Sequence, residues 1–142
     1  MEFPVRIPFV EHLGVQLEHM ADGRAVLLLE PQAEHHNSFN VVHGGVSMTL
    51  LDVVMAHAAR SVATDMGAVT IELKTSFMRP ALGALRAEGQ LLHRTATMAF
   101  TEGRIVDANG QVCAHATGTF KYVRRLPVGA KAAHDLNPPA SD

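Results

Sequence analysis

The sequence predicts an α+β fold in which a curved antiparallel β-sheet wraps around one long central α-helix. Three observations support this. The segment between Gly45 and Thr64 lacks proline and glycine and is apolar nearly all round, which predicts a helix covered on most sides. The segments after it alternate apolar and polar residues with period two, which is typical of strands. Short turns separate these strands, and strands joined in that way pair antiparallel.

The length and composition favour one domain. A chain of 142 residues is enough for one ordinary domain and too short for two, and 47% of its residues are hydrophobic. We assign this domain to residues 1–125. Residues 126–142 contain two adjacent prolines and little apolar material, so we expect a disordered C-terminal tail.

Charge and cysteine content narrow the functional classes. A net charge of -2 argues against nucleic-acid binding, which needs a basic face. A single cysteine, Cys113, allows no internal disulfide and fits a reducing compartment. The N-terminus lacks a signal-peptide pattern, and the apolar helix is interrupted by Asp52 and His57, which makes it a poor membrane span. We therefore expect a cytoplasmic protein that contacts neither nucleic acid nor membrane.

The elements before the helix read as a hairpin and a loop. Asp22-Gly23, a tight-turn pair, separates a strand at Val15–Leu17 from one at Val26–Glu30. Residues 31–45 are polar and rich in turn residues, which predicts a loop or a short helical turn. The helix then runs from Gly45 to about Thr64.

Four strands follow the helix. The first is expected to bury one face made of alternate residues: Val69, Ile71, Leu73, Thr75 and Phe77. The other three strands are expected at Leu85–His93, Thr97–Val106 and Gln111–Val123, with Asn109-Gly110 as a hairpin turn before the last. A sheet curled around one helix leaves an open edge, with which a second copy of the chain could pair.

Asp52 is the one carboxylate in this apolar helix, and it requires an explanation. An ionised carboxylate in apolar surroundings is unfavourable unless it is paired or solvated, so a structural role as a cap or backbone partner is one reading. His43-Gly44-Gly45 favours a second reading. The first N–H groups of a helix lack internal partners and carry the positive end of its dipole, and glycine lets a ligand approach them. This is the geometry of an oxyanion hole, and the middle of the same helix offers a carboxylate.

The spacing of these two groups favours a site shared by two chains. Gly44 and Asp52 are eight positions apart, roughly 12 Å along a helix at about 1.5 Å per residue. Both cannot reach one carbonyl from a single chain. In a two-fold dimer with adjacent antiparallel helices, Gly44 of one subunit lies beside the partner subunit's Asp52.

The segment resembles hotdog-fold acyl-CoA thioesterases of the phenylacetate-catabolism (PaaI-like) family, over roughly residues 10–124. The matching features are Asn37, His43-Gly44-Gly45, Leu51-Asp52, Val69-Thr70-Ile71-Glu72, the strand from Lys74 to Pro80 and the segment Ala116–Phe120. The resemblance implies a hotdog fold, a homodimer that often pairs into a homotetramer as a dimer of dimers, and hydrolysis of an acyl-CoA thioester without a cofactor.

The resemblance also implies roles for individual residues. Gly44 would supply the oxyanion donor through its backbone N–H, and Asp52 would attack the thioester carbonyl or activate water. Asn37 would position the water or the thioester, and His43 would orient the substrate or the loop. Thr70, where relatives carry a small hydroxyl residue, would come from the subunit that supplies Asp52 and would hold the water.

The sequence gives weaker signals for substrate contacts and for metal sites. We assign substrate or CoA binding to Gly45, Arg79, Arg94 and Thr95, and favour Arg94 for a phosphate because arginine binds phosphate through two hydrogen bonds. Further basic candidates are Lys121, Arg124 and Arg125. No Cys/His spacing typical of a metal site is present. His57 lies about 140° around the helix from Asp52, so we expect a core or interface histidine.

Two other functional classes remain open at this point. A hotdog dehydratase or hydratase would use a histidine with a carboxylate on a hydroxyacyl thioester. A non-catalytic module would bind acyl-CoA without turnover. The sequence leaves the acyl group open among aryl, arylacetyl and medium-chain groups.

Overall fold

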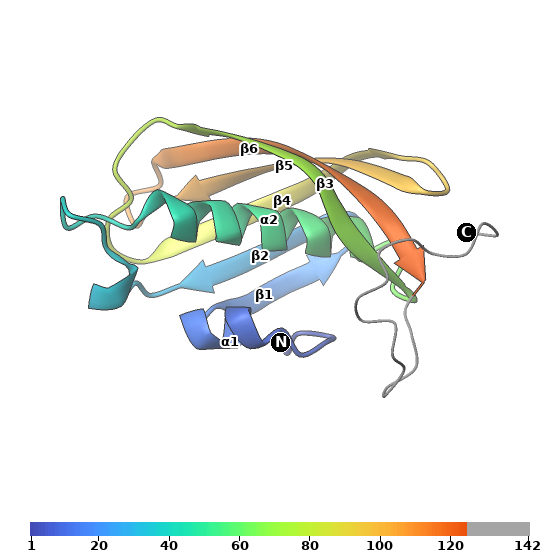
Figure 1. Cartoon of the computed structure of the whole chain (residues 1–142), viewed down its shortest axis with the longest axis horizontal. Helices are drawn as coiled ribbons and strands as arrows, with labels where there is room; N and C mark the ends of the chain where they lie inside the picture. Colours follow the sequence, from blue (N-terminus) through green and yellow to red (C-terminus); the bar gives the residue numbers. More distant parts are fainter. Residues whose placement is uncertain (125–142) are drawn as a thin grey trace.

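The computed structural model describes residues 1–124, so Arg125 and the predicted tail at 126–142 lie outside the described residues. The elements in chain order are α1 (Pro8–Leu13), β1 (Gln16–Ala21), β2 (Arg24–Leu29), the 3₁₀ turn η1 (Ala33–His35), α2 (Gly44–Arg60), β3 (Met66–Phe77), β4 (Leu85–Arg94), β5 (Met98–Val106) and β6 (Val112–Arg124). Figure 1 shows the sheet curving around α2.

The six strands form one antiparallel sheet in the order β1-β2-β4-β5-β6-β3. The long helix α2 lies across one face of this sheet (Figure 1). The hairpin, the loop with its short turn, the helix and the four following strands occur in the predicted order. The predicted α+β hotdog architecture is therefore confirmed.

The limits of the helices differ from the prediction. α2 ends at Arg60 rather than near Thr64, because the Ser61 side chain fixes the helix end. Its hydroxyl donates to Ala58 O at 2.7 Å and accepts from the Gly23 N–H at 2.7 Å, which ties α2 to the β1–β2 turn. The prediction omitted α1, although Pro8 at its first position and Gly14 in a left-handed cap are local signals for it.

Glycines in three neighbouring strands allow α2 to approach the sheet closely. A Cβ at Gly89 would lie 2.7 Å from Val54 O, one at Gly103 would lie 3.1 Å from Met55 Cγ, and one at Gly118 would lie 3.0 Å from Met55 Cε. The absence of these side chains places the middle of α2 directly on the sheet, and Met55 is completely buried there.

One stripe of α2 is not covered by the rest of the chain. The helix buries the side that faces the sheet, including Leu50, Leu51, Val54 and Met55. Residues spaced by three or four positions on the opposite side are exposed or half-buried: Gly45, Met48, Thr49, Asp52 and Ala56. We call this set the open stripe. The expectation that the helix is covered on most sides does not hold for this stripe within one chain.

The strand β3 contains a bulge that the sequence pattern does not predict. Its pairing with β6 shifts between Thr70 and Glu72, so Ile71 is an extra residue in the ladder. Thr70 faces α2, Ile71 is 57% exposed, and Leu73 packs against the core. The expectation that Val69, Ile71, Leu73, Thr75 and Phe77 share one buried face is therefore wrong, because a bulge reverses the alternation.

β3 also forms one edge of the sheet. Within residues 1–124 it pairs with β6 alone, so its other edge keeps unpaired backbone groups. Exposed apolar side chains lie along and just after this strand, at Ile71, Phe77 and Met78. Among residues 1–124, no helix is long and apolar enough to cross a lipid bilayer.

Candidate active site

The start of α2 presents one occupied and one free backbone donor. His43 is the N-cap, and its Nδ1 accepts a 2.8 Å hydrogen bond from the Gly45 N–H. This contact requires a neutral imidazole with its proton on Nε2. The Gly44 N–H makes no hydrogen bond within the part of the chain that the structure describes. The free Gly44 N–H at the positive end of a 17-residue helix is suited to bind a carbonyl oxygen that becomes negative.

Phe77 packs directly against this helix start. A Cβ at Gly44 would lie 3.3 Å from Phe77 Cζ, which is tighter than ordinary van der Waals contact. The ring is 54% exposed, so it bounds the space in front of Gly44. Phe77 is not among the predicted site residues, because no local pattern indicates a contact between residues so far apart in the chain.

The Asn37 side chain holds the loop that precedes α2. Its Oδ1 accepts hydrogen bonds from the Phe39 N–H at 2.9 Å and the Val41 N–H at 3.3 Å. Both bonds occupy the carbonyl oxygen, so the remaining polar group of this side chain, the Nδ2 amide, is a donor. Asn37 lines the same pocket as Gly44 and can offer that donor to a ligand there.

Thr70 and Asp52 form the second half of the site. Thr70 Oγ1 donates a 2.6 Å hydrogen bond to Asp52 Oδ1. The bulge at Ile71 turns the Thr70 hydroxyl toward α2, and Asp52 is half-buried on the open stripe. The contact leaves Asp52 Oδ2 available to a water molecule or a substrate.

The two halves do not meet within one chain. Gly44 and Asp52 are separated by eight residues of α2, roughly 12 Å at about 1.5 Å per residue. Phe77 accompanies Gly44, and Thr70 accompanies Asp52. Each half thus contains one residue from α2 and one from β3.

A pocket of about 610 Å³ opens at the Gly44 half. Its walls include Val42, Phe77, Met78 and Pro80, and Cys113 and the neighbouring Ala114 are buried residues of its lining. Burial raises the pKa of the Cys113 thiol, so this side chain stays protonated and neutral. The pocket is predominantly apolar, which suits an apolar substituent on the carbonyl at Gly44.

The residues predicted to bind CoA lie in two places. Arg79 lines the pocket and donates to Val112 O at 3.3 Å, while Gly45 uses its N–H to bind His43. Arg94 and Thr95 lie at the opposite end of α2. There the Arg94 guanidinium sits 4.6 Å from the centre of the Tyr122 ring and donates to Val62 O and Thr95 O.

His57 is a core residue, as the sequence indicated. It is 2% exposed, its Nδ1 lies 2.7 Å from Val53 O, and the Phe3 ring contacts it edge-on. Burial lowers the pKa of His57 and keeps the ring neutral. Among residues 1–124, histidine, cysteine and acidic side chains do not gather in any group of three that could hold a metal ion.

Comparison with known proteins gives consistent matches. A profile of the thioesterase superfamily matches residues 39–114. A protein of Saccharolobus solfataricus that carries an esterase name is 34% identical over 120 residues, which cover 84% of this chain and 85% of that protein. Human acyl-coenzyme A thioesterase 13 is 28% identical over 110 residues, which cover 74% of this chain and 77% of that protein.

Solved structures agree with this result. The PaaI protein of Escherichia coli, from the phenylacetic acid degradation operon, superposes with a TM-score of 0.74 and 25% sequence identity. The superposition covers 84% of each chain.

Proposed function

Because the chain belongs to the thioesterase superfamily, we propose that it hydrolyses an acyl-CoA thioester to a free carboxylic acid and CoA. The observation that carries this proposal is the Asp52 carboxylate, which the Thr70 hydroxyl holds on the open stripe of an otherwise apolar helix. A carboxylate that is paired on one oxygen and accessible on the other is suited to general-base catalysis.

The proposed reaction uses the two halves of the site together. Asp52 Oδ2 takes a proton from water as the water oxygen attacks the thioester carbonyl carbon. The carbonyl oxygen becomes negative and is stabilised by the Gly44 N–H at the positive end of α2. Collapse of this intermediate breaks the carbon–sulfur bond, and the departing CoA thiolate takes up the proton. Asn37 would donate to the substrate, and His43 would keep the helix start in place.

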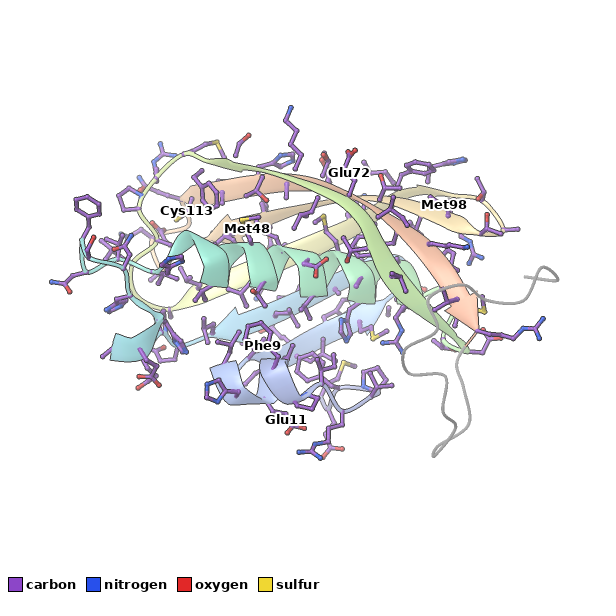
Figure 2. The ribbon with its side chains drawn as sticks, viewed as in Figure 1. Phe9, Glu11, Met48, Glu72, Met98 and Cys113 are labelled. Carbon is purple, nitrogen blue, oxygen red and sulfur yellow. The ribbon has the colours of Figure 1, made fainter. Side chains whose placement is uncertain are left out.

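The proposed site is completed by a second subunit. Antiparallel packing of two α2 helices about a two-fold axis brings Gly44 of one subunit beside the partner subunit's Asp52. The residue midway between these positions is Met48, which would then lie beside its own copy. Met48 belongs to the open stripe of α2 and is labelled in Figure 2. It is 39% exposed in the single chain, as such a contact requires before association.

The positions of Phe77 and Thr70 on β3 give a second argument for the same two-fold axis. Phe77 packs at the level of Gly44, and Thr70 lies at the level of Asp52. One two-fold axis beside Met48 therefore pairs two β3 edges about Leu73 and Lys74, and it places Phe77 near the partner subunit's Thr70. The unpaired edge of β3 and its exposed apolar side chains fit this pairing. The family resemblance adds that two such dimers associate into a tetramer.

Thiol release from a panel of phenylacetyl-, hydroxybenzoyl-, hexanoyl- and palmitoyl-CoA tests the activity. We expect wild type to release CoA and Asp52→Asn to be at least about 100-fold slower, the range for loss of a general base. Glu72→Gln is the matched control, because Glu72 is an exposed carboxylate on the side of β3 away from α2 (Figure 2), and it should keep the wild-type rate. An Asp52→Asn protein with the wild-type rate, or a wild type that binds these esters without turnover, would refute the proposal.

Cysteine cross-linking tests the shared site. Met48→Cys in a Cys113→Ala background should form a disulfide-linked dimer under mild oxidation, because the two copies lie at the axis. Gln16→Cys in the same background is the control, since Gln16 is exposed on β1, at the edge of the sheet opposite β3. Light scattering gives the assembly size. A monomer, or a dimer that cross-links through Gln16→Cys but not Met48→Cys, would contradict the arrangement.

A further inference from the structure

The end of α2 that is opposite Gly44 gathers positive charge. Arg94 and Arg124 lie there with Arg60, whose Nε donates to Met66 O. The segments 60–66, 93–98 and 121–124, which form this end, contain one carboxylate, Asp65. We call this region the basic end of the chain.

The exposed Arg94 side chain is held in place by three contacts. Its guanidinium lies 4.6 Å from the centre of the Tyr122 ring, and its Nε and Nη1 donate to Thr95 O and Val62 O. Tyr122 is itself fixed, since its hydroxyl donates to Ala59 O at 2.7 Å. A cation held on an aromatic face loses little conformational freedom when it binds an anion. The side chain is nevertheless exposed.

We infer that Arg94 binds the phosphates of CoA in the site formed with the partner's Gly44, so that Asp52 and Arg94 of one subunit serve the same substrate molecule. The acyl group then occupies the 610 Å³ pocket beside the partner's Gly44, and the CoA arm runs along the open stripe to the basic end. This inference rests on the proposed function and on its two-fold axis.

The lengths of the substrate and of the helix agree with this path. The thioester carbonyl lies level with Asp52, and α2 continues from there for eight residues to Arg60, roughly 12 Å at about 1.5 Å per residue. Arg94 is bound to Val62 O just beyond that point. The pantetheine arm between the sulfur and the phosphates is about as long as four extended residues, roughly 14 Å at about 3.5 Å per residue.

The charge of the protein also differs between the two regions proposed to bind the two ends of the substrate. The 610 Å³ pocket at Gly44 is mainly apolar and contains one basic side chain, Arg79, which is already bound to Val112 O. The basic end carries several cations against one carboxylate. An apolar acyl group therefore fits the first location and a polyphosphate fits the second.

Thioesters with and without phosphates test this assignment. S-acyl-N-acetylcysteamine has the same reacting group as acyl-CoA but lacks phosphates. Arg94→Gln should raise the KM for acyl-CoA about tenfold and leave hydrolysis of the cysteamine ester within about twofold of wild type. Arg104→Gln is the matched control, because Arg104 is an exposed arginine whose Nε donates to Glu88, and it should leave the KM for acyl-CoA unchanged. An unchanged KM in Arg94→Gln, or equal losses on both esters, would overturn the inference.

A binding measurement separates this inference from the proposed function. Calorimetric titration of Asp52→Asn, with and without Arg94→Gln, uses CoA and pantetheine as probes. We expect Arg94→Gln to weaken CoA binding about tenfold and not to change pantetheine binding. This result would stand even if wild type hydrolysed no ester, which would refute the proposed function alone. Equal CoA affinity in both proteins would refute the role of Arg94.

Mixed dimers test which subunit supplies Arg94. A dimer of wild type with the Asp52→Asn/Arg94→Gln double variant keeps one intact site, so it should show the wild-type KM at about half the wild-type kcat. A dimer of Asp52→Asn with Arg94→Gln should show the raised KM, because the remaining Asp52 belongs to the subunit that lacks Arg94. The reverse pattern would show that Arg94 serves the other subunit's Asp52 and would overturn the inference.

Discussion

Thr70 Oγ1 donates a 2.6 Å hydrogen bond to Asp52 Oδ1, and this contact joins the edge strand β3 to the open stripe of α2. The bond occupies one carboxylate oxygen and orients the other. Because the Thr70 hydroxyl still has lone pairs, it can also accept a hydrogen bond from the water that Asp52 activates.

Removal of this hydroxyl should therefore reduce the chemical step. We expect Thr70→Val, which keeps the shape, to lower kcat about tenfold, within the range for loss of a hydrogen bond to a charged group. Thr70→Ser keeps the hydroxyl and should stay within about threefold of wild type. Steady-state kinetics with the best ester of the panel measure both variants. Equal kcat values for Thr70→Val and wild type would show that the hydroxyl does not assist Asp52.

Loss of the bulge at Ile71 should reduce activity less than loss of the Thr70 hydroxyl. Deletion of Ile71 makes Thr70 and Glu72 consecutive residues opposite Phe120 and Thr119, so regular alternation still directs the Thr70 side chain toward α2. We expect this deletion to keep kcat above that of Thr70→Val and to lower the melting temperature, because the strand loses the local bend of the bulge. Steady-state kinetics and thermal unfolding measure the two effects.

Ile71→Ala is the matched control, because it keeps the extra backbone residue and removes an exposed side chain. This variant should remain within about threefold of the wild-type kcat. A deletion variant that folded but was slower than Thr70→Val would show that the bend of the bulge, and not the side-chain alternation alone, positions Thr70.

The contact between Gly44 and Phe77 predicts a coupled effect. In Gly44→Ala the new methyl group would lie 3.3 Å from Phe77 Cζ, so the ring must move away from the helix start. We expect kcat/KM to fall about tenfold with little change in melting temperature, because the ring is half exposed. Adding Phe77→Leu to Gly44→Ala should recover part of the loss, and a double-mutant cycle measures the coupling. Strictly additive effects would show that the ring does not shape the site.

His57 should make stability depend on pH. Burial lowers its pKa below the ordinary value of 6.5, so the unfolded chain binds a proton more readily than the folded chain. The contribution of His57 to the free energy of unfolding is therefore full above pH 6.5 and is lost as the pH falls through 6.5 toward the lower pKa of the folded state. Arg60, which also disfavours the charged ring, acts in the same direction.

Urea unfolding at pH 7.5, 6.5 and 5.5 measures this dependence. The free energy of unfolding of wild type should fall more steeply with acidification than that of His57→Gln, which has no titrating ring at this position. Other histidines contribute equally to both proteins, so the difference between the two curves isolates His57. Parallel curves would show that the buried ring accepts a proton without cost.

Several features of the protein follow from the sequence by itself. The long helix, the hairpin before it and the strands after it appear in the periodicity of apolar residues, which is a local property of the chain. The glycines after His43 and the carboxylate of Asp52 are also visible there, because each belongs to the same helix. Their spacing along that helix is sufficient to show that one chain does not bring them together.

Other features depend on pairing between distant segments, and only the tertiary structure decided them. The bulge at Ile71 exists because β3 and β6 change register, so the Thr70 hydroxyl faces α2 although simple alternation places it elsewhere. The packing of Phe77 on Gly44 and of Arg94 on Tyr122 joins residues far apart in the chain. Such contacts arise from the register and curvature of the sheet, which no local pattern of side chains specifies.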